Sequence, residues 1–196
     1  MSKPNVRYPT LEILFNSRPR VKVLKFLFRN YPVNVSVKEL SKRTQEPTES
    51  IRKEMNDFSK IGLVKVLAGN YHALDNGFEF FDELKDLILK SSPAEKDKMI
   101  QRITGLGQVK LAIISGVFLN SRGGGDSEVD LFIVGDKVKK YKLRKFLRSL
   151  EAEVGKEIRF GLMEKKEFEY RHSMFDRFVR VLLDSPHEKL INKLGL

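Results

Sequence analysis

Two acidic residues stand two positions apart at the start of an apolar segment in the second half of the chain. Glu128 and Asp130 open the sequence EVDLFIVG, residues 128–135, which has the apolar character of a buried strand. Because side chains alternate along a strand, we expect both carboxylates on one face. Two carboxylates so placed can hold Mg²⁺ against a nucleoside triphosphate, as metal-assisted group transfer requires.

A second set of polar side chains lies in residues 48–61. Ile51, Met55 and Phe58 recur at helical spacing, Thr48 is the expected cap, and Gly62 ends the pattern. Donors on the outer face of such a helix can reach base edges or phosphates in the major groove of DNA. The candidates are Thr48, Ser50, Arg52, Lys53, Asn56 and Lys60. The acidic Glu49, Glu54 and Asp57 argue against this interpretation.

Further candidates flank this helix. Lys42 and Arg43 end the preceding predicted helix and can reach a nucleic-acid backbone, while Asn70, near Lys65, lies in a predicted hairpin turn that can touch a flanking groove. The alternative is that these charges are only solvated and that the segment makes protein contacts.

The helices and strands that would position these side chains are predicted from the spacing of apolar residues and from the capping and turn residues between them. We expect a helical turn over 11–15 and helices over 19–30, 37–43 (capped by Ser36) and 48–61. A hairpin of strands 63–67 and 71–74 follows. This order, in VSVKELSKRTQEPTESIRKEMNDFSKIGLVKVLAGNYHAL, resembles the winged helix-turn-helix regulators of the MarR and ArsR kind over residues 11–75. The resemblance implies binding to double-stranded DNA, commonly as a symmetric homodimer.

The remaining chain alternates strands and helices. Two helices, over 78–88 and 94–104, form a connector. Strands are expected over 109–118, 128–135, 157–163 and 190–191, with helices over 137–154, 164–170 and 174–183. The fold class is therefore α+β or α/β with two domains and a small mixed sheet in the second. The expected domains are 1–76 and 107–196, joined by the connector 77–106.

The motif DSEVDLFIVGD resembles the second strand of the minimal nucleotidyltransferase family, in the DNA polymerase β superfamily. The stretch KEIRFGLMEKKEFEYRHSMFDRFVRVLL is similar to the later part of such domains, and the likeness covers residues 107–192. It implies that Glu128 and Asp130 are metal ligands, with a third carboxylate from the next strand, where Glu157 is the only candidate.

This chain departs from that family in several places. The Gly-Ser pair is reversed as Ser115-Gly116, and residues 117–119 read as continued strand rather than as a helix start that would cradle phosphates. The glycine-rich residues 123–125 lack the partners of a phosphate loop and read as a connection. Arg159 follows Glu157 on the same face and can pair with it. These departures favour a domain that has lost catalysis and needs no cofactor.

Residues 137–148 carry only positive charges. Seven cations and no acid occur there: Lys137, Lys139, Lys140, Lys142, Arg144, Lys145 and Arg148. Leu143, Phe146, Leu147 and Leu150 supply the buried stripe, so the cations cover the exposed face. This face is either solvated or a polyanion contact, to phosphates, RNA or an acidic partner.

Composition limits the classes of function. The 196 residues carry 37 Lys and Arg against 26 Asp and Glu, for a net charge of +11, which suggests a polyanionic partner. There is no Cys, which excludes thiol catalysis and disulfides, and only three His, which argues against zinc. No run of about 20 apolar residues and no leader-like start occur, so we expect a cytoplasmic protein without membrane contact.

Besides an antitoxin-like partner protein in which neither site acts alone, two hypotheses remain open from sequence alone. The first is a DNA-binding transcription regulator whose C-terminal domain senses a ligand or mediates assembly. The second is a Mg²⁺-dependent nucleotidyltransferase that modifies a protein, RNA or small molecule, in the manner of toxin–antitoxin systems.

Overall fold

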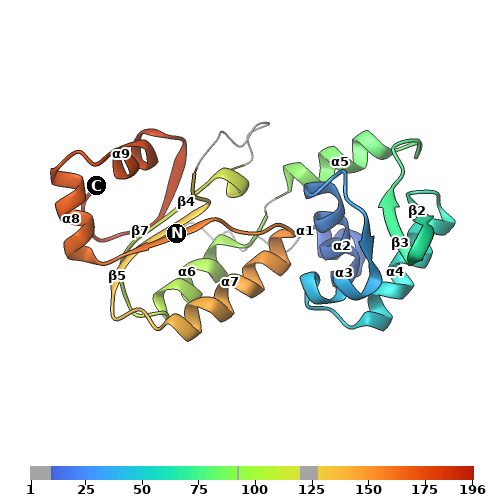
Figure 1. Ribbon diagram of the computed structural model, residues 1–196, viewed down its shortest axis with the longest axis horizontal. Helices are drawn as coiled ribbons and strands as arrows, with labels where there is room; N and C mark the ends of the chain where they lie inside the picture. Colours follow the sequence, from blue (N-terminus) through green and yellow to red (C-terminus); the bar gives the residue numbers. More distant parts are fainter. Residues whose placement is uncertain (1–9, 92, 120–127) are drawn as a thin grey trace, which may run out of the picture. The chain divides into compact units, whose positions relative to one another are not determined.

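The computed structural model describes residues 10–91, 93–119 and 128–196. The chain has a mixed α+β fold with a three-stranded antiparallel sheet and a four-stranded mixed sheet (Figure 1). The expected mixture of helix and strand is thus confirmed. Unit 1 comprises residues 1–91 and 151–156, and unit 2 comprises residues 92–150 and 157–196. The segment 77–106, expected as one connector, is divided between them.

Unit 1 holds five helices in its described part. They are α1 (Thr10–Phe15), α2 (Arg18–Arg29), α3 (Val37–Thr44), α4 (Thr48–Lys60) and α5 (Phe81–Lys90). The hydroxyls of Ser17 and Ser36 cap α2 and α3 by accepting backbone N–H bonds from the first turn, as expected for Ser36. The predicted cap of α4 is wrong, because Pro47 holds the cap position and Thr48 is the first helical residue.

The C-terminus of α4 is fixed by backbone geometry. The Leu63 N–H donates to the Phe58 carbonyl at 2.9 Å, and the Gly62 N–H donates to the Ser59 carbonyl at 3.1 Å. Gly62 has φ +81°, a left-handed conformation that side chains disfavour. This is the Schellman arrangement, in which Leu63 packs back on Phe58 while Gly62 reverses the chain.

The hairpin predicted after α4 is confirmed. Strand β2 (Val64–Leu67) pairs antiparallel with β3 (Tyr71–Leu74), and the short β1 (Val35–Ser36) pairs with the other edge of β3. The connection η1 (Ala68–Asn70) is a 3₁₀ turn. Its Gly69 and Asn70 have positive φ, which glycine and asparagine tolerate best.

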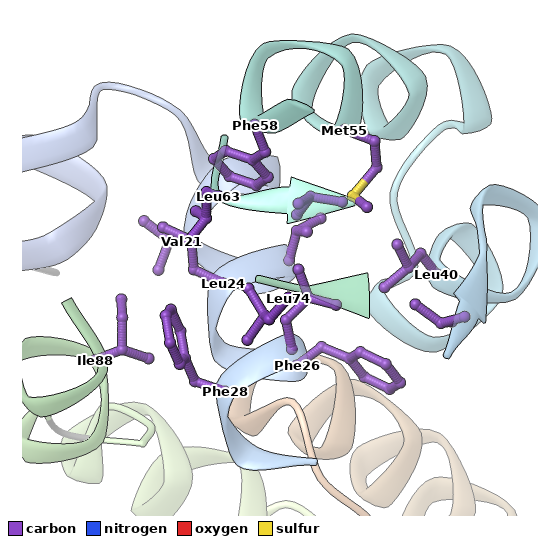
Figure 2. Packing of buried hydrophobic residues seen from close by; sticks show 14 of the residues in the cluster. Val21, Leu24, Phe26, Phe28, Leu40, Met55, Phe58, Leu63, Leu74 and Ile88 are labelled. Atoms are coloured by element: carbon purple, nitrogen blue, oxygen red, sulfur yellow. The ribbon is translucent and has the colours of Figure 1, made fainter. Parts of the chain in front are cut away.

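One apolar cluster holds unit 1 together. Side chains from α2, α3, α4 and the hairpin meet there, as Figure 2 shows for Leu24, Leu40 and Met55. Ile51 and Leu40 are fully buried. Ile88 on α5 belongs to the same cluster. Burial of a side chain of this size contributes about 1.5–3 kcal/mol, so α4 is held chiefly by its inner stripe.

Unit 2 is built on the four-stranded sheet, in the order β6-β5-β4-β7. The strands are β4 (Gln108–Ser115), β5 (Leu131–Asp136), β6 (Phe160–Met163) and β7 (His187–Asn192). Among the described strands of this sheet, β5 pairs parallel with β6, and β4 pairs antiparallel with β5 and β7. The central strands β4 and β5 are buried almost throughout, which explains their continuous apolar sequence.

Helices cover both faces of this sheet. They are α6 (Lys96–Thr104), α7 (Lys140–Val154), α8 (Lys165–Ser173) and α9 (Arg177–Asp184). Phe168 of α8 and Val179 of α9 pack with Phe132 of β5 on one face. Helices α6 and α7 lie along the other face (Figure 1).

The structure corrects several predicted boundaries in unit 2. The first strand ends at Ser115 rather than residue 118, because Gly116 has φ +51° and begins the 3₁₀ turn η2 (Gly116–Phe118). Strands β5 and β6 begin three residues later than expected, and α7 begins at Lys140 because Lys137 has φ +52°. The glycine-rich residues 123–125 lie outside the described residues.

Over the ranges that the structure describes, no helix combines the length and apolar content needed to cross a membrane.

Candidate functional site

Helix α4 is oriented by an ion pair on its inner side. The Glu54 carboxylate accepts a hydrogen bond from Arg20 Nε at 2.6 Å and one from Ser17 Oγ at 2.7 Å. Glu54 is only 6% exposed. Arg20 also reaches Asp57 at 3.4 Å. Of the three acids that argued against nucleic-acid binding, Glu54 therefore faces α2, whereas Asp57 contacts Arg20 from the border of the outer surface. The contact between Glu54 and Arg20 fixes the rotation of α4 about its axis.

A buried lysine fixes the turn between α3 and α4. Lys22 Nζ donates to the Thr44 carbonyl at 2.8 Å and to the Glu46 carboxylate at 2.6 Å. The Ser41 hydroxyl donates to the Glu46 carbonyl, and Thr48 Oγ1 donates to Ser41 Oγ at 3.1 Å. Because these bonds satisfy the polar groups of the turn, the angle between α3 and α4 is set before any ligand binds.

The outward side of α4 brings together most of the residues predicted for it. Seven side chains line one open surface along the helix: Glu49, Ser50, Arg52, Lys53, Asn56, Asp57 and Lys60. Thr48 is exposed at its beginning and tied to Ser41. We call these seven side chains the α4 face.

The charges of the α4 face are partly paired. Arg52 Nη1 lies 2.7 Å from Glu49, with both side chains more than half exposed, and Lys60 lies 3.6 Å from Asp57. Such exposed pairs contribute at most about 1 kcal/mol, so a phosphate can displace the carboxylate. Lys53 is exposed and makes no ion pair within the described residues.

The flanking candidates lie on other elements. Lys42 and Arg43 are exposed in the last turn of α3. Asn70 is exposed at the hairpin connection. Lys65 on β2 lies 2.8 Å from Asp75, and the hydrogen bonds from Lys65 and from the Gly77 N–H lower the pKa of Asp75. Lys65 is therefore engaged within the hairpin.

The acidic pair of unit 2 does not share a strand face. Glu128 and Asp130 precede β5, and Glu128 is exposed whereas Asp130 is 2% exposed. Asp130 Oδ1 accepts bonds from the Val117 N–H and Arg159 Nη2, and Oδ2 accepts bonds from the Arg159 N–H and Nε, all at 3.0 Å. Arg159 thus pairs with Asp130.

These contacts set the protonation of Asp130. Burial acts to raise its pKa, but the hydrogen bonds from Arg159 and from the Val117 N–H outweigh burial and lower the pKa below the usual value. The carboxylate is ionised and its oxygens are occupied by protein donors. In the part of the chain that the structure describes, no three His, Cys, Asp or Glu side chains are grouped to hold a metal ion.

Glu157, the third carboxylate that the resemblance implied, lies three residues before β6 on the exposed surface. The cation Arg159 contacts the carboxylate of Asp130. The hydrogen bonds of Asp130 with Val117 and Arg159 join η2 to the starts of β5 and β6. Asp130 is therefore a structural carboxylate, and its oxygens are not free to bind a metal ion.

The basic run of residues 137–148 is exposed on α7 and on the turn before it. Lys137 and Lys139 lie in the turn, and Lys142 donates to the Gly105 carbonyl at 3.4 Å. Sequence reasoning overlooked Tyr141, which is 76% exposed among these cations. The sequence did contain a signal for it: Tyr141 stands three and four residues before Arg144 and Lys145, a spacing that places all three side chains on one side of a helix.

Comparison with models of protein families, with curated proteins and with solved structures finds no match to this chain.

Proposed function

We propose that unit 1 is a winged helix-turn-helix module that binds double-stranded DNA through α4, and that the protein acts as a cytoplasmic transcription regulator. Three features support this proposal: the order α2, α3, α4 and hairpin, the three-stranded sheet β1-β3-β2, and the Schellman turn that leads α4 into β2. In such modules the third helix enters the major groove and the hairpin contacts the flanking backbone.

The observation that carries the proposal is the inward orientation of Glu54. Its pairing with Arg20 and Ser17 removes one negative charge from the α4 face and leaves Arg52 and Lys53 projecting outward. Ser50 and Asn56 add neutral donors on the same surface. A helix with cations outside and an apolar stripe inside can approach phosphates without losing its packing.

For unit 2 we propose a nucleotidyltransferase-like domain that lacks catalysis and serves ligand sensing or assembly. The bidentate contact of Arg159 with Asp130 supports this view, because a carboxylate that already accepts four hydrogen bonds is a poor ligand for Mg²⁺. The alternative of Mg²⁺-dependent transfer requires Asp130 to exchange Arg159 for the metal.

We further propose that the protein is a homodimer that pairs through β6. This edge strand has the uncharged sequence Phe160-Gly161-Leu162-Met163, and Phe160 and Leu162 are 48% and 38% exposed. The other edge, β7, carries Glu188 and Lys189 and a register shift, which protect it from pairing. Antiparallel pairing of two β6 strands about Gly161 and Leu162 places Arg159 opposite Glu164 of the partner subunit.

A map of the DNA segments that the protein occupies in its native cell tests the regulator proposal. We expect discrete sites upstream of genes, and a duplex copied from such a site should bind the purified full chain more tightly than a shuffled duplex. A typical specific preference is at least about 1,000-fold. Equal affinity for the shuffled duplex, or no enrichment at any site, would overturn the proposal.

A further inference from the structure

Helix α7 presents a cationic surface that is distinct from the α4 face. The side chains of its inner side, Leu143, Phe146, Leu147 and Leu150, are buried. Its outer side carries four cations and one aromatic residue, all exposed: Lys140, Tyr141, Arg144, Lys145 and Arg148. We call these five side chains the α7 face.

The cations of the α7 face are available to a ligand. The side chains of Lys140, Arg144, Lys145 and Arg148 form no ion pair or hydrogen bond with any residue in the described ranges. On α8, by contrast, Lys165 and Arg171 pair with Glu169 and Glu167 four residues away. A solvated helix surface commonly mixes both signs in this way, whereas like charges at such spacing repel and destabilise the helix. The single sign of the α7 face therefore suggests a polyanionic ligand.

Tyr141 identifies the kind of polyanion. It is 76% exposed and lies three, four and seven residues before Arg144, Lys145 and Arg148, so it shares their side of the helix. Exposure of a large aromatic ring forgoes its burial in the core. A ring with cations one and two turns away can stack on a base while the cations hold neighbouring phosphates.

The geometry of bases in nucleic acids decides between duplex and single strand. In a duplex the base faces are stacked on one another and closed to a surface tyrosine, whereas in a single strand they are accessible. From Lys140 to Arg148 the helix rises about 12 Å, at about 1.5 Å per residue. This length can contact a short segment of single-stranded nucleic acid. We propose that the α7 face binds single-stranded nucleic acid, with Tyr141 stacking on a base.

This site is independent of the proposed function of α4, because it lies on unit 2 and uses different side chains. The test measures fluorescence anisotropy of the full chain with labelled oligouridylate, oligothymidylate and a mixed-sequence duplex at low salt. We expect both single strands to bind the wild type. A preference for oligouridylate points to RNA as the natural ligand, and equal or tighter binding of oligothymidylate points to DNA.

The decisive variant is Tyr141→Ala. It should weaken single-strand binding by roughly 5- to 150-fold, the range typical for loss of one base stack, and leave duplex binding unchanged. Tyr141→Phe should restore the affinity, because the ring rather than the hydroxyl stacks. Tyr170→Ala on α8 is the matched control, since Tyr170 is also exposed, at 66%, and its loss should have no effect.

The role of the cations is tested with the double variant Arg144→Ala and Arg148→Ala. The control is the double variant Lys166→Ala and Arg180→Ala, which also removes two positive charges. The first pair should weaken single-strand binding and reduce its dependence on salt, and the control pair should not. All these side chains are exposed, so circular dichroism should report an unchanged fold. Single-strand affinity that Tyr141→Ala does not alter, or equal competition by polyglutamate as expected of a surface for an acidic protein, would overturn the proposal.

Discussion

Arg159, the residue before β6, donates two parallel hydrogen bonds to the buried Asp130 carboxylate, from Nε to Oδ2 and from Nη2 to Oδ1, each of 3.0 Å. The Arg159 backbone N–H adds a third bond, and the Asp130 N–H donates in return to the Arg159 carbonyl at 2.7 Å. Two residues 29 positions apart in sequence thereby lock the starts of β5 and β6 together.

Asp130→Asn should therefore destabilise the protein. The amide cannot accept all four bonds and removes the charge that Arg159 neutralises, so the free energy of unfolding should fall by about 2 kcal/mol, with the exposure of Arg159 limiting the effect. Urea denaturation measures this change. Asp184→Asn removes an exposed partner of Arg180 and serves as the control, with an expected change of less than about 0.5 kcal/mol.

The same contact predicts a pH dependence. Because the pKa of Asp130 is lower in the folded than in the unfolded state, its stabilising contribution is complete above the unfolded value of about 4. It is lost as the pH falls toward the folded pKa. The difference in Tm between wild type and Asp130→Asn should thus be constant from neutral pH to about 5 and shrink below about 4. A difference that grows on acidification would contradict the assignment of the ionised carboxylate.

Gly116→Ala should be more damaging than Gly195→Ala, although both glycines have positive φ. A Cβ at residue 116 would overlap Asp130 Oδ1 and lie 3.3 Å from Arg159 Nη2, so the substitution both strains the backbone and displaces the ion pair. We expect a loss of about 3 kcal/mol in thermal or urea unfolding. Gly195→Ala has a similar φ of +75° but open space around it, and should cost only about 1 kcal/mol. Equal losses would show that the contact with Asp130 is unimportant.

Glu54→Ala should loosen the anchoring of α4. It leaves Arg20 and Ser17 without their buried acceptor, and the expected loss of stability is about 2–3 kcal/mol. Glu49→Ala removes an equal charge from the exposed side of the same helix and should change stability by less than about 0.5 kcal/mol. The same Glu49→Ala should strengthen duplex binding, since it frees Arg52 from its carboxylate. Weaker duplex binding by Glu49→Ala would argue against Arg52 as a phosphate contact.

Phe160→Lys combined with Leu162→Lys should convert a dimer into a monomer. Charges on an edge strand repel an identical strand and oppose edge-to-edge pairing. Sedimentation velocity should show the wild type at twice the mass of the variant. Val66→Lys on the hairpin, at a side chain 60% exposed, is the control and should remain dimeric. A wild type that sediments as a monomer at micromolar concentration would exclude the β6 interface.

Much of unit 1 follows from sequence, because each of its elements is marked by local signals. Ser36 begins α3, Gly62 ends α4, and the inner stripe of α4 repeats at helical spacing, so the structure agrees closely with the predicted boundaries. The inward orientation of Glu54 could not be predicted in the same way, since it depends on Arg20, 34 residues earlier.

Unit 2 shows where such signals fail. Val117 and Phe118 are as apolar as the strand before them, and only the backbone conformation of Gly116 separates strand from turn. Local spacing favoured a pair between Arg159 and Glu157. The parallel pairing of β5 with β6, which brings Arg159 beside Asp130, is a long-range contact without a local signature.

The most direct test of the account is the binding of duplex DNA by Arg52→Ala with Lys53→Ala, measured by anisotropy across a salt titration. We predict a loss of at least about 1 kcal/mol in binding free energy, about fivefold in Kd, and a shallower dependence of log Kd on log salt by about two counterions. Lys166→Ala with Arg180→Ala on unit 2 carries the same charge change and should bind as the wild type does. Unchanged affinity and salt slope in the α4 variant at low salt would contradict the claim that this helix contacts DNA.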